Sequence, residues 1–379
     1  MTYRRAAIPA LAGGLLLTAL LWWAGASTQA LHLEGTTSTI GGRAAAELER
    51  WLAPWAYDPP EGYRLGAEVS GGIGDTASVD NSRYLSLYTT AMQIRFAAVF
   101  AFFLPGALLL LRRLPPVQGR TPATLLGVWA WGVVAGTLAV AVSAPWSIAA
   151  NGRGSYRFLP HLASVIGSGR QVLVLTALVA AAVTVLVARI ALKGAEPAPR
   201  RPVAARAARL SASVGTAVVA LSLIVLSYQS VAAQIQMISP DGGPLAEPGD
   251  LLRQWLLLGG WVGPSGGSIG DWLLYRAGDV LLLVLVWWAL RALPGLLTRA
   301  TFPAMALGAV CATVVGLIAS QLLGMVTNGT GMRWDLLQLS GTLGNGVPAA
   351  LTVGSVAGLA AAAALRAAGH RDTESGAEA

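Results

Sequence analysis

Charged residues, cysteine and histidine are all scarce in this chain of 379 residues. Only 12% of the residues are charged, whereas about a quarter is usual in a soluble domain, which indicates that lipid surrounds much of the chain. The single cysteine, Cys311, excludes a disulfide framework, and the histidines at 32, 161 and 370 lie too far apart for zinc-ligand spacing. No Walker motif, nucleophile elbow or metal-ligand cluster is present, so the sequence predicts neither a cofactor nor a metal.

Apolar residues, by contrast, make up 55% of the sequence and gather in stretches close to the ~20 residues that cross a bilayer. We place the spans at 7–26, 91–111, 123–145, 171–192, 211–233, 272–290, 302–326 and 347–365. This pattern predicts an all-α polytopic integral membrane bundle of about eight transmembrane helices. A basic start and Ala24-Gly25-Ala26 also fit a cleaved signal peptide, but an apolar run of roughly 18 residues favours a retained first helix.

The distribution of basic residues predicts the orientation. With the N-terminus inside, the inner segments hold 15 basic residues against four acidic ones, and the rest of the chain holds 11 against 14. The inner basic residues are Arg4, Arg5, Arg112, Arg113, Arg120, Arg189, Lys193, Arg200, Arg201, Arg206, Arg209, Arg291, Arg299, Arg366 and Arg371. We therefore expect both termini in the cytoplasm.

Among the 26 basic residues Lys193 is the one lysine, and this bias, with the abundant alanine and glycine, is typical of a high-GC bacterial genome. The expected location is a bacterial plasma membrane. The expected partner is the lipid bilayer and not a nucleic acid, because the basic residues lie in short loops. A membrane protein partner or a second copy of the chain stays open.

Several motifs recur in the same order, which predicts a tandem duplication. Asn151-Gly152-Arg153-Gly154 and Asn328-Gly329-Thr330-Gly331 are 177 residues apart, and the G-x-G motifs at 167–169 and 344–346 keep the same offset. Ser-Gly-Gly segments at 70 and 265, and Arg-x-Leu-Pro segments after the second and sixth spans, also correspond. The predicted organisation is a first four-helix half at 1–193 with a long outer loop at 27–90, a basic cytoplasmic linker at 194–210, a second half at 211–365 and a cytoplasmic tail at 366–379. Two halves that run the same way form a parallel repeat, related by an axis near the membrane normal.

Three ionisable residues near the outer ends of spans are the candidate substrate-binding residues: Arg95, Arg276 and Asp279. Arg276 and Asp279 are three residues apart, so they share one helix face and can pair. The alternative is that these side chains extend toward the outer lipid headgroups. Charges at paired positions in the two halves would instead line a polar vestibule between them.

The Asn-Gly-x-Gly loops are candidate site elements too, through Asn151, Gly152, Gly154, Asn328, Gly329 and Gly331. Asparagine and glycine accept positive φ at little cost, so tight turns are the simpler interpretation. The segments 50–55 and 250–261 combine tryptophan, leucine and arginine over too few residues to span. They are typical of outer interfacial helices, with re-entrant half-helices as the alternative.

Two enzymatic interpretations remain remote. Gly72-Ile73-Gly74-Asp75 fits the pattern of intramembrane aspartyl proteases, but it lies in a hydrophilic loop, where two aspartates cannot meet inside the bilayer. The acidic residues of the first outer loop, which are Asp58, Glu61, Asp75 and Asp80, are also compatible with a membrane-embedded glycosyltransferase. An enzyme is therefore not the expected class.

The topology resembles the streptophobe family of very hydrophobic eight-span actinobacterial membrane proteins. The resemblance covers the first span, the long outer loop, Tyr84-Leu85-Ser86-Leu87 before the second span and the Arg112-Arg113 exit. It implies the eight-span fold and no defined activity, so it assigns no functional residue.

Two classes of function follow from these patterns. The parallel repeat and the charges near span ends favour a transporter or permease-like protein. The absence of charge deep in the bilayer favours a non-transporting scaffold or a permease-like subunit of a larger complex. A continuous polar cavity between the halves is expected of the first class and not of the second.

Overall fold

A computed structural model describes residues 3–33, 35, 39, 41–59, 65, 77–117, 119–152, 158–193, 203–225, 255–256, 258, 269–328 and 343–375. The helical elements are α1 (Tyr3–Ala26), η1 (Gln29–His32), α3 (Gly42–Leu52), η2 (Ala53–Trp55), α4 (Ala77–Arg113), α5 (Thr121–Ala150), α6 (Phe158–Ile166), α7 (Arg170–Ala191), α8 (Ala205–Ala220), the π-turn η4 (Leu221–Val225), α11 (Ile269–Leu296), α12 (Phe302–Asn328) and α14 (Val347–Ser375). The described residues contain no strand, and the all-α class is confirmed.

Seven of these helical stretches are long and apolar enough to cross a membrane. They are Arg5–His32, Ser82–Arg113, Thr121–Ala150, Ser164–Ala191, Arg276–Leu296, Phe302–Val326 and Val347–Ala368. Each matches a predicted span, so the chain is a multi-pass membrane protein. The remaining predicted span, 211–233, is helical through α8 and η4 as far as Val225, and its last residues lie outside the described part.

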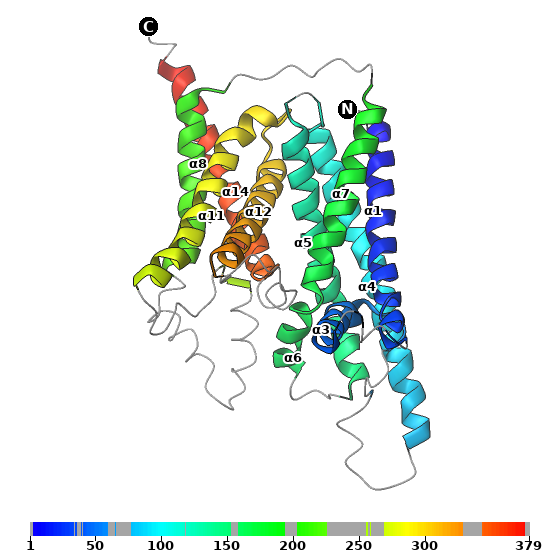
Figure 1. Ribbon diagram of the computed structural model, residues 1–379. Helices are drawn as coiled ribbons and strands as arrows, with labels where there is room; N and C mark the ends of the chain where they lie inside the picture. The colour runs from blue at the N-terminus through cyan, green and yellow to red at the C-terminus, as the bar shows by residue number, and fades with distance from the viewer. Residues whose placement is uncertain are drawn as a thin grey trace.

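The helices form two groups of four with the same order of neighbours (Figure 1). In the first group α1 packs on α4, α4 on α5, α5 on α7, and α7 returns to α1. In the second group α8, α11, α12 and α14 repeat this closed order. The groups meet where α12 contacts α4 and α5, and where α14 contacts α5. Both termini lie at one end of the bundle, and α3 and α6 lie at the other, which we call the outer end after the orientation that the sequence predicts (Figure 1).

Matching glycines introduce the last helix of each group. Gly169 precedes α7 with φ +65°, and Gly346 precedes α14 with φ +77°. Both values lie in the left-handed region that favours glycine. Each glycine is also covered by the outer segment of its own group, because Trp55 lies against Gly169 and the Leu258 carbonyl lies 3.0 Å from a Cβ built on Gly346. The two glycines therefore have the same backbone conformation at the same place in their helix groups.

Small residues let the helices of each group approach closely. A Cβ built on Gly354 or Gly358 of α14 would lie 2.8 Å from Val310 Cα or 2.5 Å from Ala306 Cα of α12. A Cβ on Gly136 of α5 would lie 2.2 Å from Leu173 of α7. These glycines are therefore points of helix contact.

Candidate functional site

The segment that follows α3 is fixed inside the outer end of the first helix group. Trp55 is fully buried, and its indole Nε1 donates to the Gly169 carbonyl oxygen at 2.9 Å. The Tyr88 hydroxyl of α4 donates to the Ala56 carbonyl oxygen at 2.8 Å. On α1, only a glycine fits at position 25, because a Cβ there would lie 1.9 Å from the Trp55 carbonyl oxygen. Trp55 therefore packs among the helices and is not exposed at the surface, as an interfacial tryptophan would be.

Arg95 crosses from α4 to α5 beneath this segment. Its Nε donates to Ser143 Oγ at 2.8 Å, one terminal nitrogen donates to Ser147 Oγ at 3.1 Å, and the other donates to the Pro54 carbonyl oxygen. The guanidinium carbon lies 5.9 Å from the centre of the Trp55 ring. With 3% of its surface exposed, Arg95 does not extend toward lipid headgroups. The reason is that two serines one turn apart on α5 offer acceptors within the bundle.

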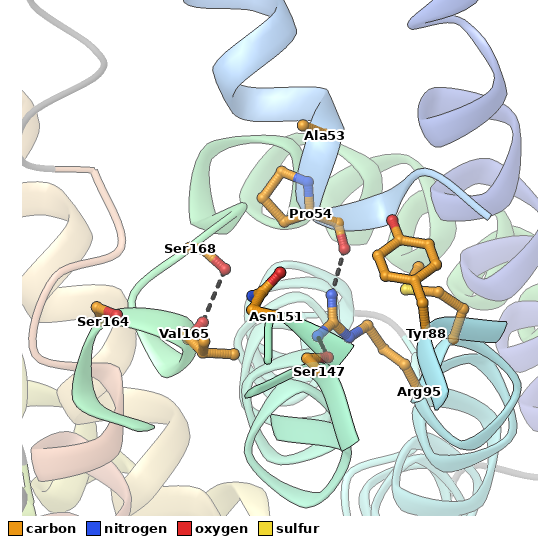
Figure 2. A pocket seen from close by; sticks show the side chains of 10 residues that line it. Ala53, Pro54, Tyr88, Arg95, Ser147, Asn151, Ser164, Val165 and Ser168 are labelled. Carbon is orange, nitrogen blue, oxygen red and sulfur yellow. Dashed lines mark hydrogen bonds between the residues drawn. The ribbon is translucent and has the colours of Figure 1, made fainter. Parts of the chain in front are cut away.

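A cavity of about 220 Å³ opens beside Arg95 (Figure 2). That volume is far above the ~10–15 Å³ that one water needs. Its walls come from η2, α4, the end of α5, and α6 with the turn after it. The residues that line it are Ala53, Pro54, Tyr88, Met92, Arg95, Ser147, Asn151, Ser164, Val165 and Ser168. Arg95 is the one charged residue in this lining, and serines and an asparagine supply most of the other polar groups. The outer pocket, as we call it, therefore suits a small solute that carries negative charge or accepts hydrogen bonds.

Asn151 and Gly152 of the first Asn-Gly-x-Gly motif form a turn, and Asn151 is part of the pocket wall. Asn151 ends α5, and its backbone N–H donates to the Ile148 carbonyl oxygen at 3.1 Å. Gly152 follows with φ +74°. Gly154, Gly329 and Gly331 lie outside the described residues, and Asn328 is described only as the last residue of α12. The structure therefore brings Arg95 and Asn151 together in one site.

Arg276 and Asp279 pair with each other on α11, in the second group. The Arg276 terminal nitrogen lies 2.9 Å from Asp279 Oδ2, and the two side chains are 44% and 24% exposed. Neither residue lines the outer pocket. The expected pairing is confirmed. The expected vestibule between the halves is not formed by these three residues, because Arg95 turns into its own helix group.

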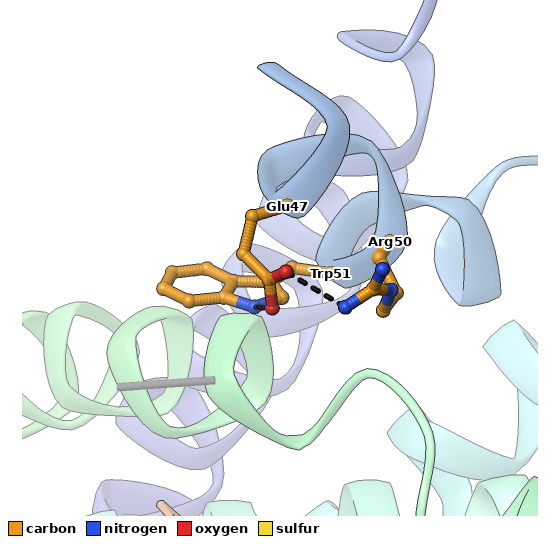
Figure 3. A network of polar contacts seen from close by, with 3 residues as sticks. All are labelled: Glu47, Arg50 and Trp51. Atoms are coloured by element: carbon orange, nitrogen blue, oxygen red, sulfur yellow. Dashed lines mark hydrogen bonds and ion pairs between the residues drawn. The ribbon is translucent and has the colours of Figure 1, made fainter. Parts of the chain in front are cut away.

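Two polar clusters at the outer end did not follow from the sequence. Glu47 of α3 is buried and accepts hydrogen bonds from Arg50 at 2.8 Å and from the Trp51 indole at 3.1 Å, as Figure 3 shows. The spacing of three and four residues was the available signal. This cluster keeps the carboxylate from facing apolar surroundings alone, which would be costly.

The second cluster, the outer seam cluster, joins the two helix groups. Arg170 at the start of α7 donates to Asn345 Oδ1 in the turn before α14. Gln321 of α12 donates to the Asn345 carbonyl oxygen at 3.0 Å and accepts from the Gly344 N–H at 2.8 Å. No local pattern predicts it, since Arg170 and Asn345 are 175 residues apart.

The acidic residues of the remote glycosyltransferase interpretation are largely outside the described side chains. Asp58 is described and exposed, whereas Glu61 and Asp75 are not described and Asp80 is described only as part of α4. Among the described residues, no three His, Cys, Asp or Glu side chains gather as a metal site requires. Comparison with known protein families, curated proteins and solved structures finds no match to this chain.

Proposed function

We propose that this membrane protein is a transporter or permease-like protein whose first helix group binds a small anionic solute in the outer pocket. The observation that carries the proposal is the buried Arg95 guanidinium in the wall of a polar cavity near one end of the bundle. Ionisable groups within a span are rare and are typical of substrate paths. The serines at 147, 164 and 168 and Asn151 supply further hydrogen-bonding groups for such a solute.

A non-transporting scaffold, or a permease-like subunit of a larger complex, is the second candidate. The observation that favours it is the close apolar contact between the groups, where buried Cys311 of α12 donates to the Gly127 carbonyl oxygen of α5 with 3.3 Å between the atoms. A transporter would need this contact to open or the solute to pass through one group. The two candidates therefore differ in whether the pocket only binds or also releases its solute to the other side.

We also infer that the two helix groups are duplicated halves and that both termini are cytoplasmic in a bacterial plasma membrane. The equal order of neighbours and the pair Gly169 and Gly346 support the duplication. The position of both termini at one end of the bundle, together with the arginine-rich inner segments, supports the orientation (Figure 1). A likeness to streptophobes is compatible with this organisation and adds no activity.

Reporter fusions test the orientation. A cytoplasm-active reporter fused after Ala379 should be active, and one fused after Gly249, in the loop between the fifth and sixth spans, should be inactive, because these positions face opposite sides. A periplasm-active reporter should give the reverse pattern. Periplasmic activity at Ala379 would overturn the orientation and place the outer pocket in the cytoplasm.

Closing the outer pocket tests the proposed function. Ser164 lines the pocket and is exposed, so phenylalanine there should fill the cavity while leaving the packed helices intact. We expect saturable uptake of inorganic phosphate or succinate into proteoliposomes by the unmodified protein, and its complete loss in Ser164→Phe. Ser86→Phe is the matched control, because Ser86 is an exposed serine on α4 outside the pocket lining.

The outcomes separate the two candidates. Anion-dependent thermal stabilisation that Ser164→Phe abolishes, without uptake, would retain the pocket as a binding site and favour the scaffold or subunit. Uptake that survives in Ser164→Phe at the level of Ser86→Phe would remove the outer pocket from the transport path. No binding and no uptake of either anion would contradict the anionic substrate class.

A further inference from the structure

Arginines converge at the other end of the molecule, where the two helix groups meet beside the termini. The connection between α4 and α5 and the connection between α11 and α12 touch there, because the Thr298 N–H donates to the Arg113 carbonyl oxygen at 2.8 Å. The first connection is itself compact. Thr124 Oγ1 of α5 donates to the Leu114 and Arg120 carbonyl oxygens at 2.9 and 3.0 Å. The backbone at this place is therefore well defined and joins both groups.

We call these two connections, 114–120 and 297–301 with the helix ends beside them, the inner seam. The inner seam is basic and contains no acidic residue. Arg112, Arg113 and Arg120 belong to the first connection, and Arg299 follows Thr298 in the second. Along the chain, no acidic residue occurs between Asp80 and Glu196 or between Asp279 and Asp335. Neither connection contains an acidic residue, so its arginines give this place a positive charge that attracts anions.

Arg113 of the inner seam has a side-chain donor that makes no hydrogen bond within the described part of the chain. The Nε atom of Arg113 is buried and has no hydrogen-bond partner among the described residues. A buried donor of this kind calls for an acceptor such as an ion or ordered water. The guanidinium fork matches phosphate oxygens in geometry and in charge, which makes phosphate the best-fitting acceptor.

The position of the inner seam favours the phosphate of a lipid headgroup over a free phosphate ion. Arg113 is the last residue of α4, Phe302 is the first residue of α12, and both helices contain candidate membrane spans. The inner seam therefore lies at the level of lipid headgroups, where phosphates are concentrated. Close by in the second group, Arg366 of α14 lies 3.8 Å above the Phe302 ring, so this arginine is held by an aromatic face at the same end.

We propose that the inner seam is a binding site for the phosphate headgroup of an anionic phospholipid, with Arg113 and Arg299 as its principal ligands. The bound lipid bridges the two helix groups, since one ligand belongs to each. The site is separate from the outer pocket and does not depend on the proposed transport of an anion.

Nanodiscs of phosphatidylcholine with a minor share of phosphatidylglycerol test the site. The measured quantity is the enrichment of phosphatidylglycerol over phosphatidylcholine among lipids retained by the protein in native mass spectrometry. A hydrogen bond to a charged group contributes on the order of tenfold in binding. The double variant Arg113→Gln with Arg299→Gln should therefore reduce the enrichment by at least about tenfold.

A second double variant, Arg189→Gln with Arg291→Gln, is the matched control. Both residues are exposed and lie toward the same end, Arg189 in the last turn of α7 and Arg291 five residues before the end of α11, and neither belongs to the inner seam. The control removes the same charge and should keep most of the enrichment. Unchanged elution and helix content of both variants confirm that folding is intact.

Three results would overturn the proposal. Equal loss in both double variants would show only diffuse attraction to the membrane surface. Unmodified protein without enrichment would show that no lipid site exists. Displacement of the lipid by inorganic phosphate at constant ionic strength would assign the inner seam to a free anion instead of a headgroup.

Discussion

Replacing Arg95 by methionine should lower the free energy of unfolding by about 3 kcal/mol. The substitution keeps much of the apolar stem but removes every donor to Ser143, Ser147 and the Pro54 carbonyl oxygen. Each buried acceptor left without a partner costs roughly 1–3 kcal/mol. Part of that loss is offset because the variant no longer buries a charge.

The effect of Arg95→Met is measured by denaturant titration in detergent micelles, followed by tryptophan fluorescence. The control is Arg83→Met, since Arg83 lies on the same helix and is exposed. We also expect faster proteolysis near Pro54 in Arg95→Met, because the segment loses one of its hydrogen bonds to α4. Equal unfolding midpoints for the two variants would show that the Arg95 hydrogen bonds add no stability.

Adding one methyl group at Gly358 should destabilise the second helix group by about 2–3 kcal/mol. In Gly358→Ala the new Cβ would lie 2.5 Å from Ala306 Cα and from the Met305 carbonyl oxygen, both backbone atoms of α12. Backbone cannot rotate aside as a side chain does, so α14 and α12 must move apart. The loss of close packing weakens helix association in the membrane.

A glycine with open space provides the opposite expectation. Among the described residues, no atom lies within 4 Å of a Cβ built on Gly324, which belongs to α12 as well. Gly324→Ala should be neutral or stabilising by up to about 1 kcal/mol, because alanine favours the helix. Steric trapping or detergent unfolding of the two variants measures the difference. If both alanine substitutions change the free energy of unfolding in the same direction, the contact of α12 with α14 is not as close as described.

The apolar runs predicted the helices well because a spanning helix depends on local hydrophobicity alone. The pairing of Arg276 with Asp279 was predictable for a similar reason, since both residues lie one turn apart on one helix. Gly354 and Gly358 lie one turn apart on α14, a local pattern that allows the close contact they form with α12. Each of these features is encoded within a single element.

The outer pocket could not be predicted in the same way. Arg95 meets serines 48 and 52 residues further along the chain and a carbonyl 41 residues before it. Arg95 is buried because α4, α5 and η2 surround it together. The sequence shows only its place near the end of a span, and that place favoured an extension toward the headgroups. The burial of Trp55 could not be predicted for the same reason. A tryptophan in a short polar segment is typical of an interface, and only its docking on Gly169 and Gly25 shows that it is internal.

The contacts between the two helix groups are spread along the length of the bundle. Arg113 with Thr298 lies at the end that carries the termini, Arg170 with Asn345 lies at the outer end, and Gly127 with Cys311 lies between them. If one group tilts against the other about the middle contact, one end separates while the other is pressed together. Opening both ends at once would break both terminal contacts together. In the proposed transporter, this arrangement of contacts would therefore oppose a continuous pore and would expose the solute to one side of the membrane at a time.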